Sequence, residues 1–446
     1  MRGFSEASVC YDSGHGDGRP VKLAKLIQIL LLVGALSAQT TYPTKFEPSV
    51  AADSRVAAAL RAIEARQEAL IRDWIRLAEI PAASGGEQAR AQYVREQLPG
   101  MGFTSIRIDP IGNVIAERPG SDPNGPVIAL AAHTDTVFAA TIPRKVKREG
   151  GKLYCPGIGD DTSGLTALLE AFRAMQQAGI RTRGKLVFVA TVQEETRLQG
   201  ARYFLERSGI HPDMFVAVDI QLGEVWYGAL RISRLKFVYT SPGSHTLYSR
   251  GQPTPARAVA MAIQNVYGIP LPPIEPGLAG MKLPVINVGM LGGGTVMNSI
   301  PQEAWFTVDL RSLDSSTQDR LESELVRVAR SVADKEGVGF RLEKPQGEDV
   351  NFSKAQSRET RRAHPLVQTA VDIQNYMQLS RSPVKPLDMG STDANVAIGM
   401  GIPGIAVGGA KYTGPHTLDE FAEESSIVPG AKMLLLLATT LAGLSN

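Results

Sequence analysis

Short apolar runs alternate with longer amphipathic segments along most of this chain. Apolar runs of four to eight residues are typical of buried strands, whereas apolar residues three or four positions apart are typical of helices. Strands are therefore expected at residues 104–108, 113–117, 126–132, 185–192, 215–220 and 405–408. Helices are expected at residues 51–77, 86–98, 165–177, 364–378 and 431–444. This alternation predicts an α/β fold with a doubly wound, mostly parallel sheet that carries helices on both faces.

The pattern changes near residue 228. From there the order is strand, helix, strand, strand, helix, strand, at residues 234–240, 256–266, 285–291, 304–311, 321–336 and 339–343. This order predicts a small α+β domain inserted into the larger one. The expected parts are an N-terminal extension (1–38), the first part of the large domain (51–228), the inserted domain (229–345) and the second part of the large domain (346–446). The last part is expected to begin with a polar loop at 348–363.

The first forty residues have the pattern of a targeting segment. Lys22 and Lys25 precede an apolar run at 26–36, and Ser37 and Ala38 supply small residues for cleavage. This pattern predicts a secretory signal peptide and therefore export to the periplasm or the extracellular space. A short membrane anchor is the alternative, although the run is short for a bilayer span.

The polar, glycine-rich segment 1–20 is unusual ahead of a signal peptide. A translation start at Val21 would explain it, and detection of peptides from this segment in the precursor would exclude that start. Cleavage near Ala38 would also remove Cys10 and leave Cys155 as the only cysteine. No intramolecular disulfide would then be possible.

Composition narrows the range of partners. The chain has 446 residues, of which 43% are hydrophobic, so it can bury large cores and is expected to hold two domains rather than one. Its 47 basic and 45 acidic residues give a formal net charge of +2. This balance gives no argument for nucleic acid or an anionic membrane as a partner.

A His-x-Asp sequence follows the apolar run at 126–132. Residues two apart in an extended segment point the same way, so His133 and Asp135 can share one site at the carboxyl end of a strand. Open α/β sheets bind ligands at that edge. A metal-binding imidazole usually needs a carboxylate or carbonyl to orient it, and Asp135 is placed for that role. The motif alone is weak, because a strand that ends in a solvated aspartate has the same pattern.

Two pairs of acidic residues follow. Asp160 and Asp161 lie between glycines shortly before the helix expected at 165–177, where the helix dipole favours negative charge. Capping explains one of the two. Glu194 and Glu195 directly follow a buried strand, where adjacent acids are costly unless metal or protons neutralise them. Surface acids at the start of a helix are the alternative interpretation.

Two further side chains that can bind metal stand near strand ends. Asp219 lies at the end of the strand expected at 215–220, and His416 follows the strand expected at 405–408. Neither is informative alone, because a single histidine is more often structural. However, five separate strand ends or helix starts each supply such a side chain. These ends converge in a doubly wound sheet, which predicts a metal site.

Taken together, the residues from about Ser54 onward resemble a family of dinuclear zinc exopeptidases and deacylases. This family includes peptidase T, glutamate carboxypeptidase, aminoacylase, acetylornithine deacetylase and succinyl-diaminopimelate desuccinylase. The resemblance implies two Zn²⁺ ions per subunit, with Co²⁺ or Mn²⁺ as substitutes. The implied ligands are His133 and Asp219 for one zinc, Glu195 and His416 for the other, and Asp160 as the bridge between them.

The resemblance also implies catalytic roles. Glu194 would be the general base that takes a proton from a water bridging the two zinc ions, and Asp135 would orient His133. The peptide bond between Asp160 and Asp161 would be cis. Imidazole and carboxylate ligands suit Zn²⁺, and two nearby metals can share a bridging water. Many members carry Lys two residues after the bridging Asp, whereas this chain has Thr162, which weakly favours the peptidase T-like or carboxypeptidase-like branches.

The segment 229–345 resembles the family's lid or dimerisation domain, so a homodimer through these residues is expected. By resemblance, His245 stabilises the tetrahedral oxyanion, often from the partner subunit, while Asn298 and Arg311 can hold a carboxylate of the substrate. Arginine suits this task because its planar fork binds a carboxylate through two hydrogen bonds. An ion pair with Asp309 is the alternative role for Arg311.

Three functions remain open. The preferred one is a metal-dependent exopeptidase that acts on short peptides outside the cytoplasm, because a secreted enzyme meets peptides more readily than biosynthetic intermediates. A deacylase that acts on N-acyl amino acids would use the same core with a different pocket. A non-catalytic relative that keeps the fold as a scaffold is the third. The complete set of five apparent ligands together with Glu194 argues against the scaffold.

Overall fold

The computed structural model describes residues 42–274, 281–344 and 350–445, so the predicted signal peptide lies outside the described residues. The central sheet has seven strands in the order β1-β2-β6-β3-β7-β15-β8. These strands are β1 (Ser105–Ile108), β2 (Val114–Arg118), β3 (Val127–His133), β6 (Lys185–Thr191), β7 (Met214–Val218), β8 (Val225–Trp226) and β15 (Gly404–Val407). The four inner strands β6, β3, β7 and β15 are parallel, and antiparallel strands flank them. The predicted α/β fold is confirmed.

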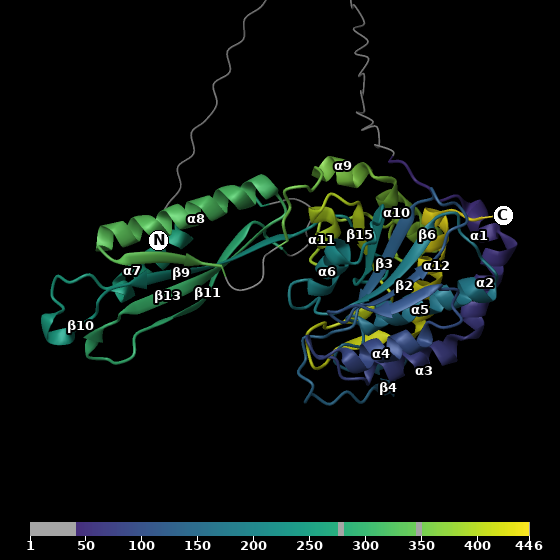
Figure 1. Cartoon of the computed structure of the whole chain (residues 1–446), viewed down its shortest axis with the longest axis horizontal. Helices are drawn as coiled ribbons and strands as arrows, with labels where there is room; N and C mark the ends of the chain where they lie inside the picture. The colour runs from purple at the N-terminus through teal and green to yellow at the C-terminus, as the bar shows by residue number, and fades with distance from the viewer. Residues whose placement is uncertain (1–41, 275–280, 345–349, 446) are drawn as a thin grey trace, which may run out of the picture. The chain divides into compact units, whose positions relative to one another are not determined.

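Helices cover both faces of this sheet (Figure 1). Ile128, Leu130 and Ala132 of β3 share one core with the apolar faces of several helices, while Ala129 and Ala131 belong to a core on the other side. The two-residue period of a strand thus produces two cores. The first face is covered by α1 (Pro48–Ala52), α2 (Ser54–Ala65), α3 (Gln67–Ala78), α4 (Gln88–Gln97), α5 (Thr162–Gln177), α10 (Pro365–Tyr376) and α12 (Ile427–Ala442). The second face is covered by α6 (Gln199–Arg207) and α11 (Ala394–Gly399).

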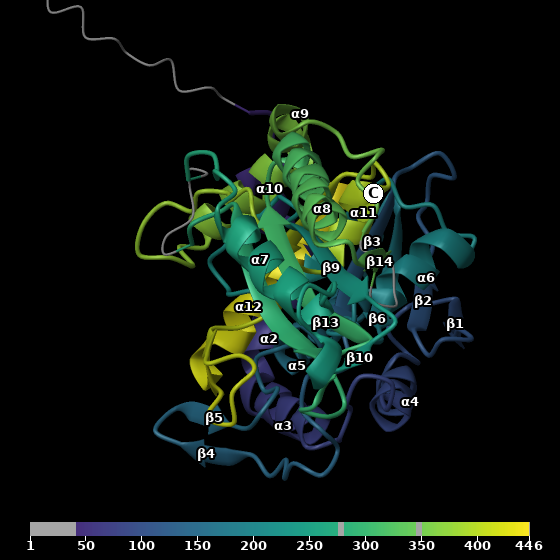
Figure 2. The same cartoon turned by 90° about the vertical axis from the view of Figure 1, so that its left-hand side faces the viewer.

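A second, antiparallel sheet has the strand order β11-β13-β9-β14. Its elements are β9 (Arg231–Thr240), α7 (Pro255–Tyr267), β11 (Val285–Gly293), β13 (Glu303–Ser312), α8 (Ser315–Glu336) and β14 (Gly339–Glu343). Helices α7 and α8 lie side by side over this sheet and share a core with it (Figure 2). A short ladder joins β10 (Ser244–His245) to β12 (Ser299–Ile300). The order of the elements follows the sequence pattern, while the bounds of the inserted domain stay a prediction.

A third sheet was not predicted. It pairs β4 (Lys147–Glu149) and β5 (Lys152–Tyr154) with β17 (Phe421–Glu423) and β16 (Tyr412–Thr413). Strands of two or three residues are too short to show a period of two, so no pattern could indicate them. This sheet connects the segment before Asp160 to the segment that carries His416.

One helix prediction and one loop prediction were wrong in detail. The helix expected at 51–77 is broken at Arg66, whose backbone leaves the helical region (φ −98°, ψ 7°) while its side chain pairs with buried Glu170 at 3.1 Å. Hydrophobic periodicity does not indicate such a long-range ion pair. The loop expected at 348–363 ends in helix α9 (Arg358–Ala363), because the Ser357 hydroxyl caps it by accepting the N–H of Thr360 at 3.2 Å.

The C-terminal helix belongs to the core. Residues Glu424–Ala442 are long and apolar enough to cross a membrane by length and composition alone, but 83% of the relevant window is buried inside the protein. Helix α12 packs against α5, α10 and strands β3 and β6. This segment is therefore a core helix that packs on the sheet.

Candidate active site

The structure brings the five predicted metal ligands together at the carboxyl ends of the parallel strands. They form two overlapping groups in which one ligand atom of each residue lies within 4.8 Å of the others. Asp160 belongs to both. The first group is His133, Asp160 and Asp219, and the second is Asp160, Glu195 and His416.

Asp160 stands between the two histidines. Its Oδ1 lies 2.9 Å from Nε2 of His133, and its Oδ2 lies 3.2 Å from Nε2 of His416. Asp219 is 3.3 Å from the same nitrogen of His133, and Glu195 is 3.2 Å from the same nitrogen of His416. Each side of Asp160 therefore holds one imidazole and one further carboxylate.

Buried Glu420, to which no role was assigned from the sequence, positions Asp160. Its carboxylate accepts hydrogen bonds from the backbone N–H groups of Gly157 (2.6 Å), Gly159 (2.8 Å) and Asp160 (3.0 Å). Glu420 lies four residues after His416, so a single contact joins the loops that carry these two predicted ligands. No spacing in the sequence indicates this contact, because its partners lie about 260 residues away.

Asp161 explains why two acids stand together. Its Oδ1 accepts the N–H of Gly164 at 3.1 Å and caps helix α5, and its Oδ2 accepts the N–H of His133 at 3.0 Å. Asp160 is left to face the histidines. The peptide bond between Asp160 and Asp161 is cis, as the family resemblance implies.

Asp135 connects His133 with the Glu194 turn. Its Oδ1 lies 3.4 Å from Nδ1 of His133, and that nitrogen is also 3.1 Å from the backbone oxygen of Asp135. The carboxylate accepts the N–H groups of Glu194 (2.9 Å) and Glu195 (3.2 Å) and the hydroxyl of Ser84 (2.6 Å). Asp135 is thus a fully buried acceptor that orients both the imidazole and the backbone of the predicted general base.

A second buried acid, Glu87, supports the same turn. Its Oε1 accepts the N–H groups of Gln193 at 3.0 Å and Gly85 at 2.8 Å. Gln193 has a positive φ of 54°, which the hydrogen bond helps to hold. Like Ser84, Glu87 was missed in the sequence, where it stood only as a polar residue at the start of the helix expected at 86–98.

Burial shifts the pKa values of the clustered acids. Burial and the charge of Asp219 raise the pKa of Glu194 well above its usual value. Burial raises the pKa of Asp219 to about 7, although His133 opposes the shift. Burial also penalises the charge of Asp160, but hydrogen bonds from His133 and His416 outweigh it and hold its pKa below the usual range. So many carboxylates at short range are costly unless cations neutralise them, and this donor set fits two divalent cations.

The predicted substrate-binding residues lie in two places. Arg311 lines a cleft beside Glu194 and His416. Its Nε and Nη2 bind the Asp309 carboxylate at 2.9 and 3.2 Å, so the ion pair considered as its alternative role is present. His245 and Asn298 do not line this cleft. His245 is part of the β10–β12 ladder and Asn298 directly precedes β12, after the far end of β9, whose ten residues span roughly 30 Å.

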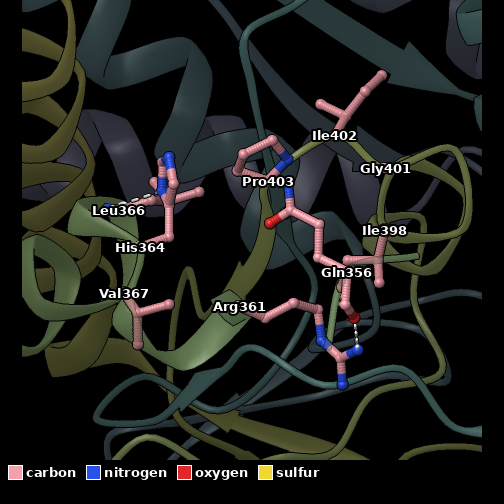
Figure 3. A pocket seen from close by; sticks show the side chains of 10 residues that line it. Gln356, Arg361, His364, Leu366, Val367, Ile398, Gly401, Ile402 and Pro403 are labelled. Atoms are coloured by element: carbon pink, nitrogen blue, oxygen red, sulfur yellow. Dashed lines mark hydrogen bonds between the residues drawn. The ribbon is translucent and has the colours of Figure 1, made fainter. Parts of the chain in front are cut away.

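A second and much smaller pocket, with a volume of about 10 Å³, opens near the amino end of β15, at the edge of the sheet opposite the cluster. Gln356, Arg361 and His364 line it together with apolar residues such as Ile398 and Pro403 (Figure 3). Arg361 donates to the backbone oxygen of Gln356 at 2.8 Å and to Asp388 at 3.2 Å. Because its guanidinium already binds these two groups of the protein, the cleft beside Glu194 is the stronger candidate for the substrate-binding site.

The site has two groups, each with one histidine and one carboxylate, and the two groups share one aspartate. This arrangement is typical of two-metal hydrolases. The chain belongs to peptidase family M20/M25/M40, whose family model matches residues 129–440. This confirms the family resemblance that the sequence motifs indicated.

Individual relatives agree with this assignment. Carboxypeptidase G2 of Pseudomonas sp. (strain RS-16) is 27% identical over 163 residues, which are 34% of this chain. The matched region spans only 39% of the length of that relative. The structure of aminopeptidase PepT from Bacillus cereus ATCC 10987 covers 84% of this chain and 99% of its own, with a TM-score of 0.67 and 20% identity. The YXEP protein of Bacillus subtilis, described as a dinuclear metal binding peptidase from the M20 family, covers 85% and 99%, with a TM-score of 0.63 and 18% identity.

Proposed function

We propose that this protein is a metal-dependent exopeptidase that hydrolyses a terminal amide bond of short peptides. The observation that carries the proposal is the position of Asp160, whose two carboxylate oxygens face His133 and His416 separately. A carboxylate with an imidazole on each side suits a pair of divalent cations, with Asp219 on one side and Glu195 on the other. Zn²⁺ is the proposed metal, with Co²⁺ or Mn²⁺ as substitutes. The similarity in fold to aminopeptidase PepT and to the YXEP protein, a dinuclear metal binding peptidase, supports this class of reaction.

When bound, the metal pair would polarise the substrate carbonyl and lower the pKa of the attacking water. Glu194 is the proposed general base, because a buried carboxylate with a raised pKa can take and hold a proton near neutral pH. It then returns that proton to the leaving amine. Asp135 keeps His133 and the Glu194 backbone in place. Arg311 and Asn298 are proposed to hold the substrate carboxylate, and His245 is proposed to stabilise the oxyanion. His245 and Asn298 would act from a partner subunit.

The test uses a panel of free tripeptides, N-blocked dipeptides and N-acetyl amino acids with the zinc-loaded protein. Release from free tripeptides alone would identify an aminopeptidase. Cleavage of blocked dipeptides would indicate a carboxypeptidase, and cleavage of acyl amino acids the alternative deacylase. Glu194→Gln should bind the same amount of zinc but lose about 10²- to 10⁴-fold in kcat. Absence of turnover on the whole panel would favour the non-catalytic scaffold.

We also infer that the protein is exported to the periplasm or the extracellular space. The support is the run of Lys22, Lys25 and the apolar residues 26–36 in the sequence. N-terminal sequencing of the mature protein should start near Gln39. A mature chain that retains the apolar run would contradict cleavage.

A homodimer through residues 229–345 is the proposed assembly. Strand β11 is one of the two edge strands of the second sheet, and its Met290 and Leu291 are 61% and 67% exposed. An edge strand with exposed apolar side chains is a template for pairing with another chain. Such pairing would also provide a site of action for His245 and Asn298, which lie away from the cleft of their own chain.

A further inference from the structure

The cleft beside Glu194 has two chemically different walls. Its volume of about 570 Å³ lies within the usual range of ligand pockets. Glu194, Glu195 and His416 form the wall that carries the proposed metal centre. A second part of the lining is apolar. We call it the apolar wall, and it consists of Leu198, Leu230, Ile232, Val350 and Phe352.

Side chains alternate in direction along an extended segment, and this alternation explains how the apolar wall forms. Leu230 and Ile232 are two residues apart at the start of β9, and Val350 and Phe352 are two apart in the segment that follows the second sheet. Residues at this spacing point to the same side of an extended chain. Two short segments from distant parts of the sequence therefore present their apolar side chains to one cleft.

The apolar wall is held in place by contacts outside the cleft. The N–H of Leu230 donates to Gly390 at 2.6 Å, and its carbonyl accepts from Nδ2 of Asn395 at 3.3 Å. The ring of Phe352 lies 5.7 Å from the guanidinium carbon of Arg231. A wall that is already ordered costs little entropy to bind a side chain, so it can contribute to specificity.

Three arginine residues also line the cleft. Arg311 is bound through two hydrogen bonds to Asp309, and Arg234 lies 3.9 Å from the same carboxylate. Arg197 also has an interaction within the protein. The Asp309 carboxylate thus partly neutralises Arg311 and Arg234, while the apolar wall offers a surface on which a substrate side chain can be desolvated.

We propose that the apolar wall is the specificity subsite of the enzyme and receives an aliphatic or aromatic side chain of the peptide next to the scissile bond. This inference rests on the proposed peptidase function. Peptides with leucine or phenylalanine at that position should be cleaved with a kcat/KM about tenfold or more above that of peptides with aspartate or glutamate. The preference follows because the apolar wall desolvates the side chain and offers no partner to a carboxylate.

The experiment compares peptides that differ only in the residue at each side of the scissile bond, with glycine, leucine, phenylalanine, aspartate and glutamate in turn. Ile232→Asn and Phe352→Ala should lower kcat/KM for leucine and phenylalanine peptides about tenfold, mainly through KM, and leave glycine peptides within about twofold. Ile108→Ala, which changes a surface residue of β1 that is 40% exposed, is the matched control and should change nothing.

Two outcomes separate this inference from the proposed function. Faster cleavage of aspartate or glutamate peptides, or an equal loss on all peptides in both variants, would overturn the apolar subsite while leaving the peptidase intact. If no peptide is cleaved, calorimetry decides. Zinc-loaded Glu194→Gln should bind leucine or phenylalanine more tightly than glutamate, and Ile232→Asn should remove the difference. Equal binding of these amino acids would overturn the inference independently of turnover.

Discussion

The backbone N–H of Glu194 donates a hydrogen bond to Oδ1 of Asp135 at 2.9 Å. The same oxygen lies 3.4 Å from Nδ1 of His133, so one buried carboxylate aligns a proposed metal ligand and the proposed general base. Asp135→Asn keeps the volume but replaces one acceptor oxygen with a donor. We expect kcat/KM to fall about 10- to 100-fold without loss of the fold, as measured by steady-state kinetics and circular dichroism.

The exposed pair of Asp319 with Arg231 provides a control for this change. Asp319→Asn should leave kcat/KM unchanged, because surface ion pairs contribute little. Near-normal activity in Asp135→Asn would mean that the carboxylate has no positioning role.

Metal stoichiometry should distinguish the shared ligand from the others. Asp160 faces both histidines, whereas His416 belongs to one group only. We expect Asp160→Asn to weaken binding of both zinc ions and His416→Ala to weaken one. Isothermal titration with zinc, checked by elemental analysis, measures this difference. Two tightly bound ions in Asp160→Asn would contradict the bridging role.

Glu420 should matter for stability. Its carboxylate accepts three backbone N–H groups around Asp160, and Gln would turn a donor toward them. Leaving buried N–H groups without an acceptor costs about 1–3 kcal/mol. Glu420→Gln should lower the free energy of unfolding in urea by that amount. Asp419→Asn, at the exposed neighbouring position, should leave it unchanged; equal effects would show that the contacts of Glu420 are not specific.

His364, which lies away from the predicted metal ligands, should make the free energy of unfolding depend on pH. Its Nδ1 accepts the N–H of Leu366 at 3.2 Å and caps helix α10, a role that needs the neutral imidazole. Burial, with a smaller effect from Lys45, lowers its pKa below 6.5. The unfolded chain therefore binds the proton more readily, so this stabilisation is complete above pH 6.5 and is lost as the pH falls through the folded pKa.

His364→Asn keeps a capping acceptor that does not titrate. As the pH falls from about 7.5 to about 5, the free energy of unfolding of the wild type should decrease relative to that of the variant. Denaturant titrations at several pH values give both quantities. A difference that stays constant over this range would exclude His364 as the titrating group.

A substitution in edge strand β11 of the second sheet tests the proposed dimer. Leu291→Asp places a charge on exposed β11, and like charges from two copies would repel each other. Light scattering after gel filtration should show a dimer for the wild type and a monomer for this variant. Ile108→Asp, on the exposed edge strand β1 of the central sheet, should remain dimeric. A monomeric wild type would contradict the proposal.

Much of this structure could be predicted because its strongest signals are local. β3 and β6 are continuous apolar runs, and polar residues that can bind metal follow their ends directly. Ser84, Glu87 and Glu420 were missed because their role exists only in the folded chain. Their partners lie 51, 106 and 260 residues away, and a hydrogen bond over such a separation leaves no period in the sequence. The break at Arg66 was missed for the same reason.

The place of β15 between β7 and β8 affects how the protein is made. Because β15 begins only at Gly404, the ribosome must synthesise the entire second sheet before the central sheet can close. A nascent chain carries His133, Asp160 and Asp219 long before Glu420 and His416 emerge to join them. The order of synthesis thus keeps the unfinished polypeptide without the full set of proposed metal ligands, so the proposed activity cannot begin before the central sheet closes.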